Sequence, residues 1–87
     1  MIKLNDLVTK CSLDGEIVLL DGRRGSYFGL NEVGSRMLEL AMQSEDRESA
    51  ITTLLSEFDA DESEIRKDFD ELLKKLLSKK LIVDHEA

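Results

Sequence analysis

Proline is absent from this chain of 87 residues, and cysteine and histidine occur once each. The single cysteine excludes a disulfide within the chain, and with only one histidine it cannot assemble an ordinary zinc site. Long apolar runs are also missing, since no segment approaches the roughly 20 apolar residues of a membrane-spanning helix. The N-terminus lacks the apolar stretch of a signal peptide. We therefore expect a cytoplasmic protein.

Acidic side chains outnumber basic ones by 19 to 12, which gives the chain a net charge of −7. Such a surface repels phosphate backbones and anionic lipids, so neither nucleic acid nor a membrane is an expected partner. The length corresponds to one domain, and we expect residues 1–87 to form it.

Turn signals divide the first part of the chain into short strands. Asp14-Gly15 and Asp21-Gly22 separate apolar runs, and they predict strands over 7–13, 16–20 and 26–30 in an antiparallel meander. The middle strand is continuously apolar over 17–20, so we expect both of its faces to be covered. The last strand has no further neighbour, and its open edge invites a peptide or a second copy.

After position 30 the apolar residues recur at helical spacing. Asn31, Asp46 and Asp61 are suited to cap three successive helices. A short strand is expected over 81–83. Strands followed by helices around one core predict the α+β class. The third helix is expected to be the longest, with an apolar stripe made of Ile65, Phe69, Leu72, Leu73, Leu76 and Leu77.

No set of residues predicts catalysis. His85 lies two residues from the C-terminus, where chains usually fray. Cys11 has no histidine near it in the sequence, and we expect a buried or half-buried thiol that acts as a small hydrophobe. Asp59, Asp61 and Glu62 lack the spacing of a calcium loop, so helix capping explains them better. We expect a binding module that is not an enzyme and has no cofactor.

Two alternatives fit the same elements. A winged-helix DNA-binding regulator also combines three small helices with a small sheet, but its recognition helix needs basic and polar groups. Here the first half of the third helix carries Asp61, Glu62, Glu64, Asp68, Asp70 and Glu71. The other alternative is an oligomerisation module, a homodimer in which two copies pair their edge strands.

Three segments resemble the PqqD-type proteins, the family of RiPP recognition elements that bind leader peptides of ribosomally synthesised, post-translationally modified precursors. They are Asp-Gly-Glu-Ile-Val-Leu-Leu-Asp at 14–21, Gly-Ser-Tyr-Phe-Gly-Leu-Asn at 25–31 and Val-Gly-Ser-Arg-Met-Leu-Glu-Leu at 33–40. Phe-Asp-Ala-Asp at 58–61, followed by a leucine-rich helix, is similar as well, and the resemblance spans about residues 7–83.

The resemblance implies a winged helix-turn-helix-like fold in which the leader peptide adds as an antiparallel strand beside the third strand, facing the third helix. The chain looks most like the small free-standing members that present lasso-peptide precursors to a separate leader peptidase, a transglutaminase-like cysteine protease, or to another modifying enzyme. PqqD itself, the precursor carrier of pyrroloquinoline quinone synthesis, is the alternative. Arg23 and Arg24, in the turn before the third strand, either meet an acidic leader or are solvated.

The predicted site combines the edge of the last strand with one face of the third helix. Gly25 and Gly29 lack side chains, so another backbone can approach them. Tyr27 and Phe28 point to opposite faces of the strand, so one of them is expected to pack inside. The strand residues expected to contact the peptide are Gly25, Ser26, Tyr27, Phe28, Gly29 and Leu30. The helix residues expected to contact it are Phe69, Asp70, Leu73 and Leu76, while Ile65, Leu72 and Leu77 are expected to face the core.

Overall fold

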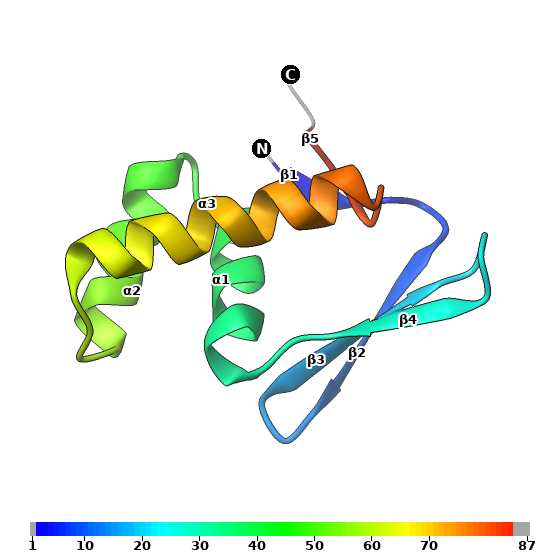
Figure 1. Cartoon of the computed structure of the whole chain (residues 1–87), viewed down its shortest axis with the longest axis horizontal. Helices are drawn as coiled ribbons and strands as arrows, with labels where there is room; N and C mark the ends of the chain where they lie inside the picture. Colours follow the sequence, from blue (N-terminus) through cyan, green and yellow to red (C-terminus); the bar gives the residue numbers. More distant parts are fainter. Residues whose placement is uncertain (1, 85–87) are drawn as a thin grey trace.

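Strands gather at the N-terminal half and helices follow them in the computed structural model, which describes residues 2–84 (Figure 1). The arrangement confirms the α+β class, and it is compatible with a winged helix-turn-helix-like description. The strands are β1 (Ile2–Leu4), β2 (Val8–Leu13), β3 (Glu16–Asp21), β4 (Ser26–Gly29) and β5 (Ile82–Asp84). The helices are α1 (Glu32–Gln43), α2 (Arg47–Glu57) and α3 (Glu62–Ser78).

The predicted meander is confirmed, with strands in the order β2-β3-β4 and antiparallel pairing throughout. Asp14 and Gly15 both have positive φ, 52° and 82°, as the tight turn between β2 and β3 requires. The expectation that β3 is covered on both faces is wrong. Ile17 and Leu19 are buried on the inner face, but Leu20 on the outer face is 42% exposed, because no helix among residues 2–84 packs over that side of the sheet.

A second, two-stranded sheet joins the two ends of the chain (Figure 1). β5 falls close to the strand expected at 81–83, and it pairs antiparallel with β1, with Leu4 opposite Ile82. β1 was not predicted, because three residues are too short to show a strand period. This pairing holds the end of α3 close to the start of β2, since Asn5 N–H donates to the Leu81 carbonyl over 3.0 Å.

All three predicted helix caps are confirmed. The side chain of Asn31 accepts a hydrogen bond from Gly34 N–H, and that of Asp46 accepts from Ser49 N–H. The carboxylate of Asp61 accepts from the amides of residues 63 and 64. Local side-chain chemistry therefore sets where each helix begins.

The core has two adjoining parts. The first lies between the sheets and the helices and includes Ile17, Leu19, Leu38, Leu76 and Ile82. The second lies among the three helices and includes Met37, Ala50, Ile51, Leu54 and Phe69. α3 contributes to both parts, so its position relative to β4 is determined by the whole core.

Cys11 is exposed on β2, so the expected buried or half-buried thiol is wrong. His85 lies outside the described residues. Within residues 2–84, no helix combines the length and the apolar content needed to cross a bilayer, and no cluster of acidic, cysteine or histidine side chains is suited to hold a metal ion.

Candidate peptide-binding site

β4 has one paired edge and one open edge among the described strands, because it hydrogen-bonds to β3 alone. Leu30, directly after β4, donates its N–H to the Ile17 carbonyl over 2.8 Å. Backbone groups alternate in direction along an antiparallel strand, so Phe28 and Ser26 also face β3. Tyr27 and Gly29 therefore direct their N–H and C=O groups away from the sheet. These four groups form the hydrogen-bonding edge that an added strand would use.

One stripe of α3, made of Asp68, Leu72 and Lys75 and continued by Lys79 directly after the helix, lies beside β4 and the start of α1. The ammonium groups of Lys75 and Lys79 lie 5.5 and 5.8 Å from the centroid of the Phe28 ring. Phe28 itself is half-buried and packs against the core. These contacts place the last turns of α3 over the inner face of β4.

Two hollows lie at the two ends of β4 along this stripe. The first, of about 180 Å³, is lined by Ser26, Tyr27 and Phe28 together with Lys79, Arg24 and Asp21. The second, of about 550 Å³, lies where α1 begins, and its lining includes Asn31, Val33, Met37, Phe58, Asp68 and Leu72. A chain that paired with β4 could place side chains in both hollows, because side chains on one face of a strand recur every second residue.

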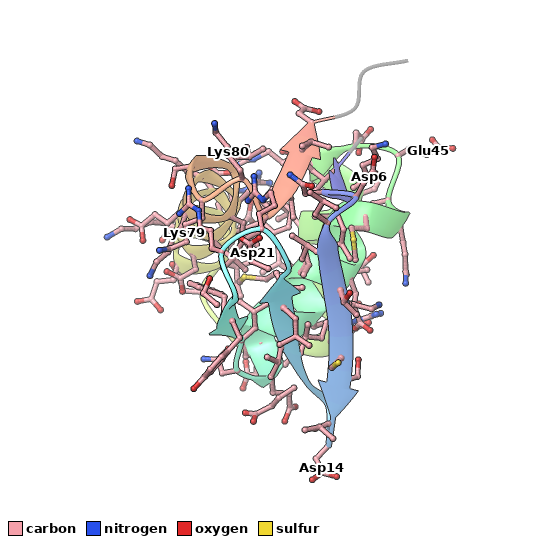
Figure 2. The ribbon with its side chains drawn as sticks, turned by 90° about the vertical axis from the view of Figure 1, so that its right-hand side faces the viewer. Asp6, Asp14, Asp21, Glu45, Lys79 and Lys80 are labelled. Atoms are coloured by element: carbon pink, nitrogen blue, oxygen red, sulfur yellow. The ribbon has the colours of Figure 1, made fainter. Side chains whose placement is uncertain are left out.

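The β3–β4 turn is fastened to the end of α3 by Arg23. Its guanidinium donates to both carboxylate oxygens of Asp21 over 3.1 Å each, and to the carbonyl of Lys80 over 3.1 Å. Figure 2 shows Asp21 at the turn, beside Lys79 and Lys80 at the end of the helix. The hydrogen bonds from Arg23 hold the pKa of Asp21 below its ordinary value. Arg23 is therefore a structural residue, whereas Arg24 lines the first hollow.

The other end of β4 is fastened by Ser35 of α1. Its buried hydroxyl accepts a hydrogen bond from Ile17 N–H over 2.7 Å and lies 3.2 Å from the Leu30 carbonyl, to which it donates. One side chain thus joins α1 to β3 and to the residue after β4. Both ends of the open edge are positioned by polar contacts that lie outside the edge itself.

The structure brings together most of the predicted strand residues and corrects one. Gly25, Ser26 and Gly29 are exposed, and Tyr27 is 77% exposed on the outer face. Phe28 packs inside, which confirms the expectation that one of the two aromatic residues, Tyr27 or Phe28, would do so. Leu30 is only 7% exposed, so its side chain belongs to the core and not to the peptide-facing surface.

The predicted division of α3 into peptide-facing and core-facing residues is wrong in most positions. Phe69 and Leu76 are 1% and 0% exposed, so they are core residues. Leu77, which was expected in the core, is 38% exposed. Leu72, also assigned to the core, is half-buried and lines the second hollow. Ile65 is buried in the core as expected, and Leu72 packs against both parts of the core from its half-buried position.

Leu73 and Asp70 lie on the side of α3 that faces away from β4. Leu73 lines a separate hollow with Phe69 and residues of the α1–α2 connection. Asp70 accepts two hydrogen bonds of 2.8 Å from the guanidinium of Arg47 in α2, which lowers its pKa. Residues two positions apart in a helix point about 200° away from each other around its axis. Asp70 is two positions from both Asp68 and Leu72, so it cannot share a face with either of them.

Sequence reasoning missed Leu72, Lys75 and Lys79 as residues of this site. Leu72 was assigned to the core, and the two lysines were given no role in the site. The available signal was the spacing of positions 68, 72, 75 and 79, which recur every three or four residues on one helix face.

A small α+β domain in which the open edge of β4 faces a helix has the architecture of the winged helix-turn-helix-like RiPP recognition elements. The sequence model of the family described as coenzyme PQQ synthesis protein D (PqqD) matches residues 16–82. The chain belongs to the PqqD family, as the three resembling segments predicted. PqqD-like recognition elements act as peptide-binding partners and not as catalysts.

Two solved structures share the fold. The chain is 30% identical to TbiB1 in a complex with the TbiA(beta) leader peptide, with a TM-score of 0.84 and coverage of 98% of this chain and 99% of that one. It is 22% identical to a lasso peptide synthetase B1 complexed with the leader peptide, with a TM-score of 0.85 and coverage of 95% and 98%. The comparison with curated protein sequences gave no match.

Proposed function

We propose that this chain is a non-catalytic adaptor that binds the leader of a lasso-peptide precursor by adding it as an antiparallel strand to β4. Residues 1–87 act as one leader-binding domain. The observation that carries the proposal is the outward direction of the backbone groups of Tyr27 and Gly29 beside the α3 stripe. An edge of this kind supplies main-chain hydrogen bonds, and the hollows beside it supply selectivity for side chains.

The leader-bound state of both structural neighbours supports this choice of ligand. In this chain the proposed contacts come from Gly25, Ser26, Tyr27, Phe28 and Gly29 of the strand segment, and from Asp68, Leu72, Lys75 and Lys79 of α3. Ordering a disordered leader costs conformational entropy, so we expect a dissociation constant in about the nanomolar-to-micromolar range.

The partner that receives the precursor is proposed to be a leader peptidase of the transglutaminase-like cysteine protease class. Binding the leader on a small domain raises the effective concentration of the precursor near that enzyme. The description of the matching family favours a second candidate, in which the chain carries the precursor of pyrroloquinoline quinone synthesis. Comparing affinities for a lasso-precursor leader and for a quinone-precursor peptide separates the two.

The test of the proposal uses a lasso-precursor leader peptide, such as the TbiA(beta) leader that the 30% identical neighbour binds, labelled with a fluorophore and titrated by polarisation. Gly29→Pro removes an outward N–H without touching the hydrogen bonds to β3, and we expect affinity to fall more than tenfold. Gly29→Ala is the matched control, because it keeps the N–H and its Cβ would meet no atom within 4 Å.

Equal affinity of the wild type and a folded Gly29→Pro variant would show that β4 is not the binding edge. Sedimentation across a concentration series, with and without peptide, tests the homodimer through edge strands. If two copies pair their β4 edges, the peptide must dissociate the dimer, because both compete for the same backbone groups.

A further inference from the structure

The charged side chains beside the open edge of β4 are sorted by sign along its length. At the end where β4 begins, the hollow is lined by Lys79 and Arg24, and Lys75 lies over Phe28 next to it. The only carboxylate lining that hollow, Asp21, is already paired with Arg23. At the end where β4 leads into α1, the hollow is lined by Asp59, Glu64 and Asp68, and no basic residue lines it.

The charged side chains of the two hollows, apart from Asp21, form no ion pairs with other described parts of the protein. Within residues 2–84, no ion pair involves Lys75, Lys79, Arg24, Asp59, Glu64 or Asp68. The arginines elsewhere on the helices are paired. Arg36 bonds to Glu57, Arg47 to Asp70 and Arg66 to Glu48, each over 2.7–2.9 Å. The unpaired charges beside β4 are therefore available to a partner.

We propose that the leader of this chain carries a basic residue followed, toward its C-terminus, by an acidic residue within the segment that pairs with β4. This inference rests on the proposed function and on the antiparallel direction of the added strand. A peptide running opposite to β4 passes the acidic end first and the basic end second. Its basic residue then meets Asp68 and Glu64, and its acidic residue meets Lys75 and Lys79.

The geometry also gives the spacing of the two charges. Asp68 and Lys79 are about 16 Å apart along the axis of α3, since each helical residue rises about 1.5 Å. An extended chain covers that distance in about five residues at about 3.4 Å each. Side chains that face α3 recur every second residue, so the separation must be even. We expect the charges to be about four or six residues apart.

The test selects random 16-residue peptides displayed on phage against the whole protein, and discards those that also bind the Gly29→Pro variant. The remaining binders depend on β4. We expect Lys or Arg to precede Asp or Glu by four or six residues in most of them. Exchanging the two charges within the tightest binder should weaken it about tenfold, because two attractive pairs become two repulsive ones.

A pair of protein variants makes the assignment specific. Lys75→Glu combined with Lys79→Glu should remove the preference for the acidic residue. Lys74→Glu combined with Lys80→Glu changes the net charge equally at the same end of α3, outside the two hollows, and should leave the preference unchanged. Equal effects of the two double variants would assign the preference to net charge and overturn the proposal.

The outcomes separate this inference from the function on which it rests. Binders that depend on β4 but show no charge order, or the reverse order, would overturn the charge-order proposal and leave strand addition intact. A selection that yields no β4-dependent binder would contradict the proposed function itself, and the charge order with it.

Discussion

The guanidinium of Arg23 clasps the carboxylate of Asp21, with both carboxylate oxygens bonded over 3.1 Å, while the same guanidinium reaches the carbonyl of Lys80 over 3.1 Å. Asp21 is only 3% exposed, so this ion pair is a buried polar contact at the edge of the core. The contact joins the β3–β4 turn to the end of α3. It therefore sets the distance between the open strand edge and the helix that faces it.

Replacing Asp21 by asparagine should destabilise the protein at neutral pH and matter less in acid. Arg23 lowers the pKa of Asp21 from its ordinary 3.8, so the folded state binds this proton less readily than the unfolded chain. The stabilisation is complete above the unfolded pKa and is lost as the pH falls through the lowered folded pKa. Urea midpoints of the wild type and Asp21→Asn should therefore differ most at neutral pH and converge as the pH falls below 3.8 and through the lowered folded pKa.

The comparison isolates Asp21 because other carboxylates with lowered pKa values, such as Asp46 and Asp61 at the helix caps, are present in both proteins. Asp14→Asn is a matched control. Its side chain is exposed at the opposite tip of the sheet from Asp21 (Figure 2), and its urea midpoint should follow that of the wild type at every pH. A constant difference between wild type and Asp21→Asn down to about pH 3 would contradict the role of the charged pair.

Ser35→Ala should lower the free energy of unfolding by about 1–3 kcal/mol, because the N–H of buried Ile17 loses its acceptor. The loss corresponds to a fall in melting temperature of about 4–8 °C for each kcal/mol in a domain of this size. Ser12→Ala, at an exposed position of β2, is the control and should melt with the wild type. Equal melting temperatures of Ser35→Ala and the wild type would mean that water replaces the hydroxyl.

Features encoded by a few neighbouring residues could be predicted from the sequence. Each of these features depends on one side chain or one backbone conformation within a few positions. They are the Asp14-Gly15 turn and the helix caps Asn31, Asp46 and Asp61. The three strands of the meander therefore begin and end within one residue of where they were expected, and the three helices begin at the expected caps. The open edge of β4 followed from the count of strands that those turns delimit.

Features that depend on distant contacts could not be predicted. β1 exists because β5 pairs with it, and Arg23 is structural because the last carbonyls of α3 lie within its reach. The apolar stripe of α3 was broad enough to fit either orientation of the helix, so Phe69 and Leu72 were exchanged between core and site. Only the packing of α1 and α2 against α3 decides which residues of that stripe remain accessible.

Leu72 and Leu73 are adjacent leucines with different roles, and truncating each to alanine should separate binding from stability. Leu72 lines the hollow where α1 begins, whereas Leu73 lines a separate hollow together with Phe69. We expect Leu72→Ala to weaken leader binding about tenfold and Leu73→Ala to leave it unchanged, although each costs about 1–3 kcal/mol of stability. Polarisation titrations below the melting temperature of both variants measure the difference. Equal loss of affinity in the two variants would mean that α3 does not present this stripe to the peptide.

Cys11 offers a probe of the outer face of the sheet, away from the open edge of β4 and the two hollows. Its thiol is exposed on β2, opposite Val18 of β3, while the proposed peptide joins the far edge at β4. The native protein should react fully with Ellman's reagent without denaturant, because reaction requires only an accessible thiolate. The labelled protein and Cys11→Ser should both bind the leader with unchanged affinity. A large loss of affinity in either would place the peptide on the outer face or the β2 edge, and a thiol that reacts only after unfolding would contradict the exposed position of β2.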